Sequence, residues 1–179
     1  MTGLNPFRHG VIEVGMMVMN DTFEIVGELF MDLCPPSNIV IDPEALEYNG
    51  FTLDRIASGR SYEEFVEFFE SFFATYFRNA TPILVGQYIA ADIAFLASIF
   101  HDVRRHDLFL KLGNDIIDTK SMANERNAVA RYKGMEPPFK STSLSKPGGI
   151  AEVFTLSAYE AHTARGDILA TREALLRFL

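Results

Sequence analysis

The sequence predicts an α/β fold in which helices flank a mixed sheet that contains an antiparallel hairpin. Three observations support this prediction. Two apolar runs near the N-terminus are separated by the turn signal Asn20-Asp21, which is typical of a hairpin. Aromatic residues recur at three- and four-residue spacing after Ser61, as on the buried face of a helix. Short apolar segments then alternate with helical ones, an order that favours an α/β fold.

Length and composition agree with one globular domain spanning residues 1–179. The chain is 48% hydrophobic and 22% charged, which excludes disordered and collagen-like classes. One cysteine, Cys34, cannot form an intrachain disulfide, so the chain is expected to fold in a reducing compartment. The N-terminus lacks the pattern of a secretion signal, and no apolar run reaches the ~18 residues of a membrane span. We therefore expect a soluble, cytoplasmic protein with no membrane partner.

The first half of the chain has clear local signals for two strands and two helices. Strands are predicted over 10–19 and 22–33, followed by a helix that begins after the N-cap Asp42 and ends at Asn49-Gly50. Ser61 to Glu64 forms a capping box for a second helix. Its wide aromatic stripe is assigned to core packing and not to base stacking, and comprises Phe65, Phe68, Phe69, Phe72, Phe73, Tyr76 and Phe77.

The second half alternates between short strands and helices. Strands are predicted over 81–86 and 114–119, with helices over 90–103 and 120–132. A loop rich in Pro, Lys and Ser follows, then a turn around His162, and the final helix runs from about Gly166 to Phe178. The chain contains no internal repeat or linker that would divide it.

Charge is unevenly distributed. The formal net charge is −8, but residues 101–149 carry nine Lys and Arg against six Asp and Glu, a local excess of three positive charges. A basic face on an acidic protein can bind a polyanion when metal ions offset the carboxylates. An ordinary solvated surface gives the same pattern, so charge alone does not decide the function.

Asp92 is the first candidate for chemistry, because it interrupts the apolar run from Ile89 to Ala97 just after a predicted strand. A carboxylate among buried groups is costly unless it is capped, paired or bound to a cation. Two interpretations follow. Asp92 caps the N-terminus of its helix, or it is a metal ligand at the carboxyl end of a strand, where open α/β sheets bind ligands.

His162 and Asp167 form the second candidate pair, near the start of the last helix. Residues five apart on an ideal helix are about 140° away from sharing a face. The two side chains can therefore converge only if His162 lies in a turn before the helix, which Gly166 would permit. A solvated helix start remains the ordinary interpretation of this motif on its own.

Five segments, in order, together resemble the DnaQ-like (DEDDh) 3′→5′ exonucleases of the ribonuclease H-like superfamily. The two most informative are Val85 to Leu96 and His162 to Thr171, which resemble the second and third motifs. The others are Thr2 to Pro6 with Val11 to Gly15, then Glu44 to Gly50, then Asp118-Thr119. The family includes the proofreading subunit of replicative DNA polymerase, ribonuclease T and oligoribonuclease.

The resemblance implies a function and a set of site residues. Asp92 and Asp167 would be metal ligands, His162 would be the general base or the residue that orients the attacking water, and Mg²⁺ or Mn²⁺ would be the cofactor. The substrate would be the 3′ end of single-stranded DNA or RNA. By the same resemblance, Thr2, Gly3 and Leu4 would lie beside the terminal nucleotide. A homodimer and a polymerase partner are further implications.

Two departures from the family pattern affect these expectations. Met1 stands where the residue after Asp-x-Glu is expected, so the first strand, central to the sheet, and two of four carboxylates are absent from this sequence. Gln87-Tyr88 also stands where His-Asn is usual. Either the true start lies upstream and the chain is N-terminally truncated, or the motif was lost and the protein is a non-catalytic nucleic-acid- or protein-binding relative. The retained Thr-Gly-Leu favours the first explanation, and in both cases the chain alone would be impaired as an enzyme.

Overall fold

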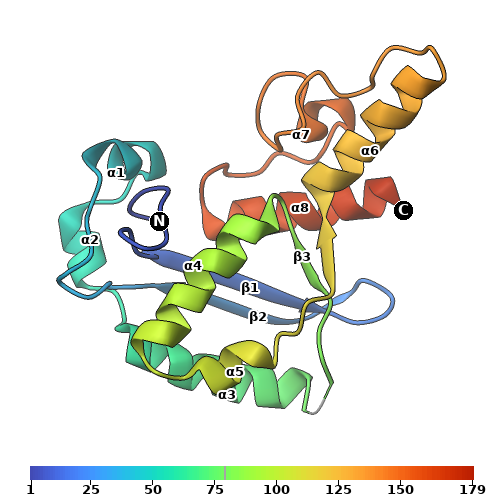
Figure 1. Ribbon diagram of the computed structural model, residues 1–179. Helices are drawn as coiled ribbons and strands as arrows, with labels where there is room; N and C mark the ends of the chain where they lie inside the picture. Colours follow the sequence, from blue (N-terminus) through green and yellow to red (C-terminus); the bar gives the residue numbers. More distant parts are fainter. Residues whose placement is uncertain (79) are drawn as a thin grey trace. The chain divides into compact units, whose positions relative to one another are not determined.

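The structure, a computed structural model, describes residues 1–78 and 80–179 and is a mixed α/β fold (Figure 1). Its contacts group the chain into two compact units. Unit 1 comprises Met1–Ile83 and Ala90–Asn114, and unit 2 comprises Leu84–Ile89 and Asp115–Leu179. Each unit is described by itself below.

Unit 1 is built on the predicted hairpin. Strand β1 (Glu13–Met19) pairs antiparallel with β2 (Ile25–Asp32), and the register shifts at Val18/Met19. Asn20 organises the loop, since its side-chain oxygen accepts hydrogen bonds from the backbone N–H groups of Thr22 and Glu24. The hairpin prediction is confirmed, although β1 begins three residues later than expected, and β2 begins three residues later and ends one residue earlier.

The helices that follow begin at the predicted caps. Helix α1 (Pro43–Asn49) is capped by Asp42 and ends at Gly50, whose φ is 69°. Helix α3 (Tyr62–Tyr76) has both hydrogen bonds of the capping box between Ser61 and Glu64. Helix α2 (Leu53–Ala57) was not predicted, because five residues are too few to establish a periodic pattern.

The core of unit 1 forms where α3 meets helix α4 (Ile89–Asp102), most of which belongs to this unit. Phe65 and Phe69 are fully buried, and the Phe100 ring meets Phe69 edge-on with centroids 4.9 Å apart. The prediction of one buried aromatic stripe was partly wrong, since Phe68 is 48% exposed and Tyr76 is 39% exposed. A 15-residue helix packed on one side buries a narrower stripe than the seven aromatic residues occupy.

The N-terminal end of α3 is fixed to the segment that precedes β1. The buried Tyr62 hydroxyl accepts a hydrogen bond from the Val11 N–H at 2.8 Å and lies 3.3 Å from the Val11 carbonyl oxygen. Burial raises the pKa of Tyr62 far above its usual range. Helix α5 (His106–Leu110) completes unit 1 and was also too short to predict.

Unit 2 contains the parallel strand pair and the C-terminal helices (Figure 1). Strand β3 (Leu84–Gly86) pairs with β4 (Ile116–Asp118), and helix α6 (Thr119–Tyr132) follows β4 directly. Helix α6 packs against α8 (Ala164–Phe178), which also contacts α7 (Ile150–Val153). The buried core of this unit comprises Ala123, Phe139, Leu144, Ile150, Ala170, Ala174 and Phe178.

The strands differ from the prediction in one respect. Antiparallel and parallel strand pairs are both present, as expected. Among the described residues, however, they form two separate two-stranded sheets and not one mixed sheet. A mixed sheet would need a strand bonded to both pairs, and within residues 1–78 and 80–179 no strand does this.

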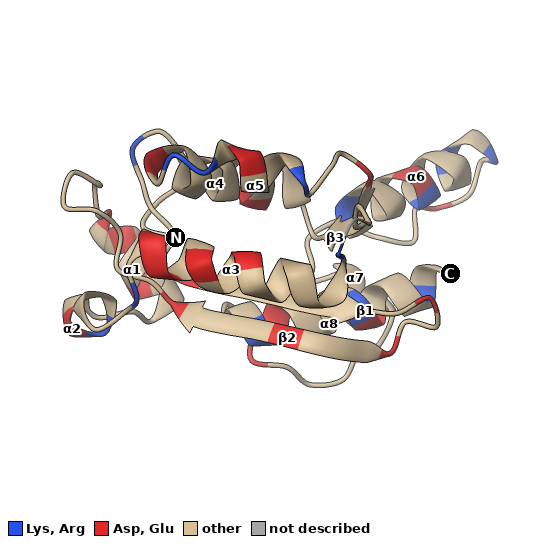
Figure 2. Cartoon of the chain, turned by 90° about the horizontal axis from the view of Figure 1, so that it is seen from below, with Lys and Arg blue, Asp and Glu red and all other residues tan. Residues whose placement is uncertain are grey.

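The two units carry very different charge (Figure 2). Unit 1 has seven Lys and Arg against 16 Asp and Glu, a net charge of −9, and unit 2 has nine against eight, a net charge of +1. Figure 2 shows acidic residues recurring along α3 and Lys or Arg residues at both ends of α6. No helix of the described chain has the length and apolar character needed to cross a membrane.

Candidate functional site

The backbone of His162 contacts the Asp167 carboxylate at the start of α8. Thr163 is the N-cap of α8, and its hydroxyl accepts a hydrogen bond from the Gly166 N–H at 3.1 Å. His162 therefore lies in the turn before the helix, with a φ of 69°. Its backbone N–H donates to Asp167 Oδ1 at 3.3 Å. The positive φ takes His162 out of the helical path, and its backbone N–H, five positions before Asp167, reaches that carboxylate.

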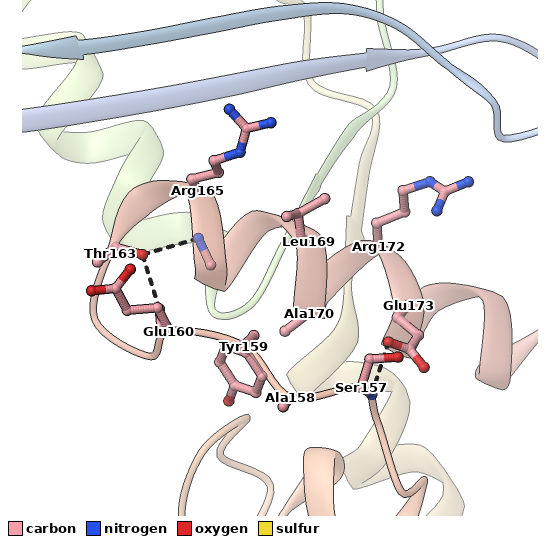
Figure 3. Close-up of a pocket in the computed structure, with 11 residues that line it drawn as sticks. Ser157, Ala158, Tyr159, Glu160, Thr163, Arg165, Leu169, Ala170, Arg172 and Glu173 are labelled. Atoms are coloured by element: carbon pink, nitrogen blue, oxygen red, sulfur yellow. Dashed lines mark hydrogen bonds between the residues drawn. The ribbon is translucent and has the colours of Figure 1, made fainter.

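Gly166 makes this turn possible through close packing. Its own φ is not in the left-handed region, but a Cβ at this position would overlap the Glu160 carbonyl oxygen. That carbonyl also accepts a hydrogen bond from the Thr163 hydroxyl at 2.9 Å. At the other end of the turn segment, the Ser157 N–H donates to Glu173 Oε2 at 3.1 Å. The segment that carries His162 is therefore attached to α8 at both ends (Figure 3).

Asp167 is only partly exposed, and this affects its protonation. Burial raises the pKa of its carboxyl above the usual range, while the hydrogen bond from His162 and the charge of that residue act in the opposite direction. Burial and the charge of Asp167 likewise raise the pKa of Tyr159. Removing a carboxylate from water without full compensation favours a nearby proton or cation. Sequence reasoning missed Tyr159, because nothing in its local pattern indicates this proximity.

A pocket lies beside this turn, between the segment 157–160 and α8 (Figure 3). Its volume is about 610 Å³. Tyr159, Leu169 and Ala170 contribute to the lining, together with Glu160 and Glu173. Figure 3 shows the side chains of Arg165 and Arg172 extending away from Tyr159. The pocket is thus adjacent to the His162 turn, because Glu160, Thr163 and Gly166 are among its lining residues.

Asp92 lies in the first turn of α4, in unit 1. The expectation that it is surrounded by buried groups was wrong, because Asp92 is exposed while Phe95 and Ile99 on the same helix are buried. An apolar run of this length on a helix has a solvent-facing side, and Asp92 is on it. Both Asp92 and Glu13 raise the pKa of the Met1 amino group, although burial, the larger effect, lowers it. These two carboxylates therefore act on the same N-terminal position.

The three residues expected beside the terminal nucleotide have different environments in unit 1. Thr2 is fully buried, and its hydroxyl donates to the Val40 carbonyl at 2.8 Å and accepts from the Gly10 N–H at 2.9 Å. Gly3 packs against the ring of His9, which occupies the space of a side chain. Leu4 is 93% exposed. Of the three, Leu4 has the side chain that is open to a ligand.

The described residues hold no preassembled cluster of three or more His, Cys, Asp or Glu side chains for a metal ion. Asp167 and His162 are brought together in unit 2, and Asp92 and Glu13 act on the N-terminus in unit 1. A joint role for Asp92, Asp167 and His162 remains a prediction.

The comparisons with known proteins concern the fold. No family model matches the sequence, and no curated protein matches it. Solved structures do match. E. coli Exonuclease I in complex with a dT13 oligonucleotide has a TM-score of 0.72 over 98% of this chain, at 18% identity. The same protein with a dA16 oligonucleotide gives a TM-score of 0.70, and with a 5cy-dA13 oligonucleotide 0.69, over 99% of this chain in both cases.

This chain shares its fold with part of Exonuclease I. The likeness extends over nearly the whole of the present sequence but covers only 38–39% of the Exonuclease I chain. At 17–19% identity the comparison establishes the shared fold and leaves the roles of individual residues to direct tests.

Proposed function

We propose that this protein is a metal-dependent 3′→5′ exonuclease acting on the 3′ end of single-stranded DNA or RNA. The observation that carries the proposal is the geometry at the start of α8, where a positive φ brings His162 to a partly buried Asp167. The fold shared with Exonuclease I, solved with oligonucleotides, supports it. We propose in addition that residues 1–179 act as one exonuclease-like domain of the ribonuclease H-like class.

The proposed reaction is phosphodiester hydrolysis. A water oxygen bonds to phosphorus, the bond from phosphorus to the 3′ oxygen of the preceding nucleotide breaks, and that oxygen takes up a proton. A nucleoside 5′-monophosphate is released. His162 would accept the proton of the attacking water as a general base. The hydrogen bond from the His162 N–H to Asp167 Oδ1 would keep the carboxylate and the imidazole ring near each other.

Asp167 fits the role of a metal ligand because its carboxylate is partly desolvated and its pKa is raised by burial. Asp92 fits because its carboxylate is exposed, and carboxylate oxygens are preferred ligands of Mg²⁺ and Mn²⁺. Bound divalent cations would supply stabilisation of the charge that develops on the phosphate. The family pattern has two further carboxylates, in Asp-x-Glu, which would be additional ligands of such a site. Cytoplasmic location, a homodimer and a polymerase partner remain predictions.

The test uses the protein with the natural coding sequence upstream of Met1, incubated with 3′-labelled single-stranded DNA and short RNA in Mg²⁺ or Mn²⁺. Replacing a general base typically lowers the rate by about 10²–10⁴-fold, so we expect losses of this order in His162→Ala and at least as large in Asp167→Ala. His101→Ala is the matched control, because the His101 side chain is 87% exposed at the end of α4 and should leave activity unchanged.

Full activity of either site variant, with folding verified by circular dichroism, would remove the assignment. A wild-type protein that binds oligonucleotides without cleaving them, with salt-dependent and metal-independent affinity, would also overturn it. That result would support the non-catalytic nucleic-acid-binding alternative. In-frame codons for an apolar strand ending in Asp-x-Glu would support the enzyme, and an upstream stop codon would support the alternative.

A further inference from the structure

Tyr88 has an uncommon backbone conformation at a position where the chain leaves the parallel strand pair of unit 2. It follows β3 by two residues, and its φ is 59°. A bulky side chain with positive φ is an outlier that persists only when its surroundings fix it. The Tyr88 side chain is nevertheless 56% exposed. The conformation therefore directs an aromatic ring outward and does not bury it.

Asp118, at the carboxyl end of β4, fixes this conformation. Its Oδ1 accepts a hydrogen bond from the Tyr88 N–H at 3.1 Å. The same oxygen accepts from the N–H groups of Lys120, at 2.8 Å, and Ser121, at 3.3 Å, and so caps α6. One carboxylate oxygen thus holds both the Tyr88 backbone and the first turn of the helix that carries Lys120.

This arrangement places the Lys120 ammonium over the Tyr88 ring, with Nζ 4.1 Å from the ring centroid. The distance is that of a cation–π pair. Because Tyr88 is 56% exposed with Lys120 over its ring, the pair presents both an aromatic surface and a cation to solvent.

The side chain of Gln87, the residue before Tyr88, is hydrogen-bonded within unit 2. The Gln87 amide donates to the Thr142 carbonyl oxygen at 2.9 Å, and its Oε1 accepts from the Thr119 hydroxyl at 2.6 Å. Gln87 therefore ties the loop after α6 to the end of the strands. The two adjacent residues therefore differ: the Gln87 side chain is hydrogen-bonded within unit 2, and Tyr88 is exposed to solvent.

We propose that Tyr88 and Lys120 form a stacking platform for an unpaired nucleobase of single-stranded nucleic acid, with Lys120 facing the adjoining phosphate. The inference rests on the proposed function and names the contact that it would use. Exposed aromatic rings interleaved with cations bind single strands with little sequence preference. The carboxyl ends of parallel strands are where α/β folds bind ligands, and the platform lies in the unit whose net charge is +1. A nucleic acid fits this pair better than an acidic peptide, because a base supplies the flat face that the ring requires.

The experiment measures binding of a fluorescein-labelled oligothymidylate by anisotropy, with EDTA present to prevent metal-dependent cleavage. Tyr88→Asn removes the ring while keeping a residue that tolerates positive φ. It should weaken binding about tenfold, the size expected for the loss of one stacked base. Tyr88→Phe should bind as the wild type does. Tyr132→Ala is the matched control, since Tyr132 is 92% exposed on α6 and should have no effect.

Two further measurements separate stacking from a structural role. With an oligomer of abasic nucleotides, the difference between wild type and Tyr88→Asn should disappear, because the phosphates remain and the bases do not. Lys120→Gln should lower the slope of log affinity against log salt by about 0.7, the value for one phosphate contact to a single strand.

The outcomes also distinguish this inference from the proposed function. If the wild type cleaves and binds oligonucleotides but Tyr88→Asn binds equally well, the platform is refuted and the exonuclease proposal stands. If Tyr88→Asn loses the same affinity for the abasic oligomer, the residue acts on the fold and the platform is again refuted. If the wild type neither binds nor cleaves, both proposals fail.

Discussion

The most direct test of the unit 2 core is the replacement of Asn127 by alanine. Asn127 is 5% exposed on α6, and its amide makes two buried hydrogen bonds to the backbone of Phe139. Its Nδ2 donates to the Phe139 carbonyl oxygen at 2.8 Å, and the Phe139 N–H donates to Oδ1 at 3.0 Å. The substitution leaves both Phe139 groups without a partner. Because each buried, unsatisfied group costs about 1–3 kcal/mol, we expect a loss of about 3 kcal/mol in the free energy of unfolding.

Urea unfolding followed by circular dichroism measures this loss. With a slope of about 2 kcal/mol per molar, the transition midpoint should fall by ~1.5 M. Asn124→Ala is the matched control, because Asn124 is exposed on the same helix and its replacement should leave the midpoint nearly unchanged. Equal midpoints for the two variants would refute the assignment of Asn127 as the residue that holds Phe139 in the core.

Three other predictions concern single residues. Asp167→Asn should raise the urea midpoint at neutral pH and leave it unchanged at pH values below the ordinary carboxyl pKa. Burial raises the pKa of Asp167 in the folded state, so the wild type loses stability as the pH rises through that pKa. An unchanged midpoint at every pH would contradict this prediction. Gly166→Ala should lower both stability and nuclease activity, since the added Cβ overlaps the Glu160 carbonyl oxygen, and a fully active, equally stable variant would disprove the close packing. Tyr62→Phe should cost about 1–3 kcal/mol in thermal or urea unfolding by leaving the Val11 N–H unpaired, and a neutral result would mean that water replaces the hydroxyl.

The sequence predicted the features that depend on neighbouring residues. The caps at Asp42 and Ser61 and the hairpin loop at Asn20 were found as expected, because each is decided within a few positions. The turn at His162 was predicted as a condition for its approach to Asp167, and the structure meets that condition.

Features that depend on distant segments were not predictable. Thr2 is buried because its hydroxyl reaches the Val40 carbonyl, a contact across 38 positions that leaves no local pattern. The exposure of Asp92 depends on which side of α4 is covered, which an apolar run does not specify. The orientation of Tyr88 depends on Asp118, 30 positions away, and on a backbone angle that composition does not reveal.

The space beside Gly166, closed by the Glu160 carbonyl oxygen, limits which residues this position can hold. This chain and Exonuclease I share a fold at 18% identity, so the fold itself does not specify most residues. The space beside Gly166, and not its own torsion angles, excludes a larger residue at this position. A substitution there would require the 157–162 segment to move as well. We therefore expect that a sequence with a histidine five positions before an aspartate, but without this glycine, lacks the turn between the two residues. The glycine is then a marker of this turn when further sequences are compared.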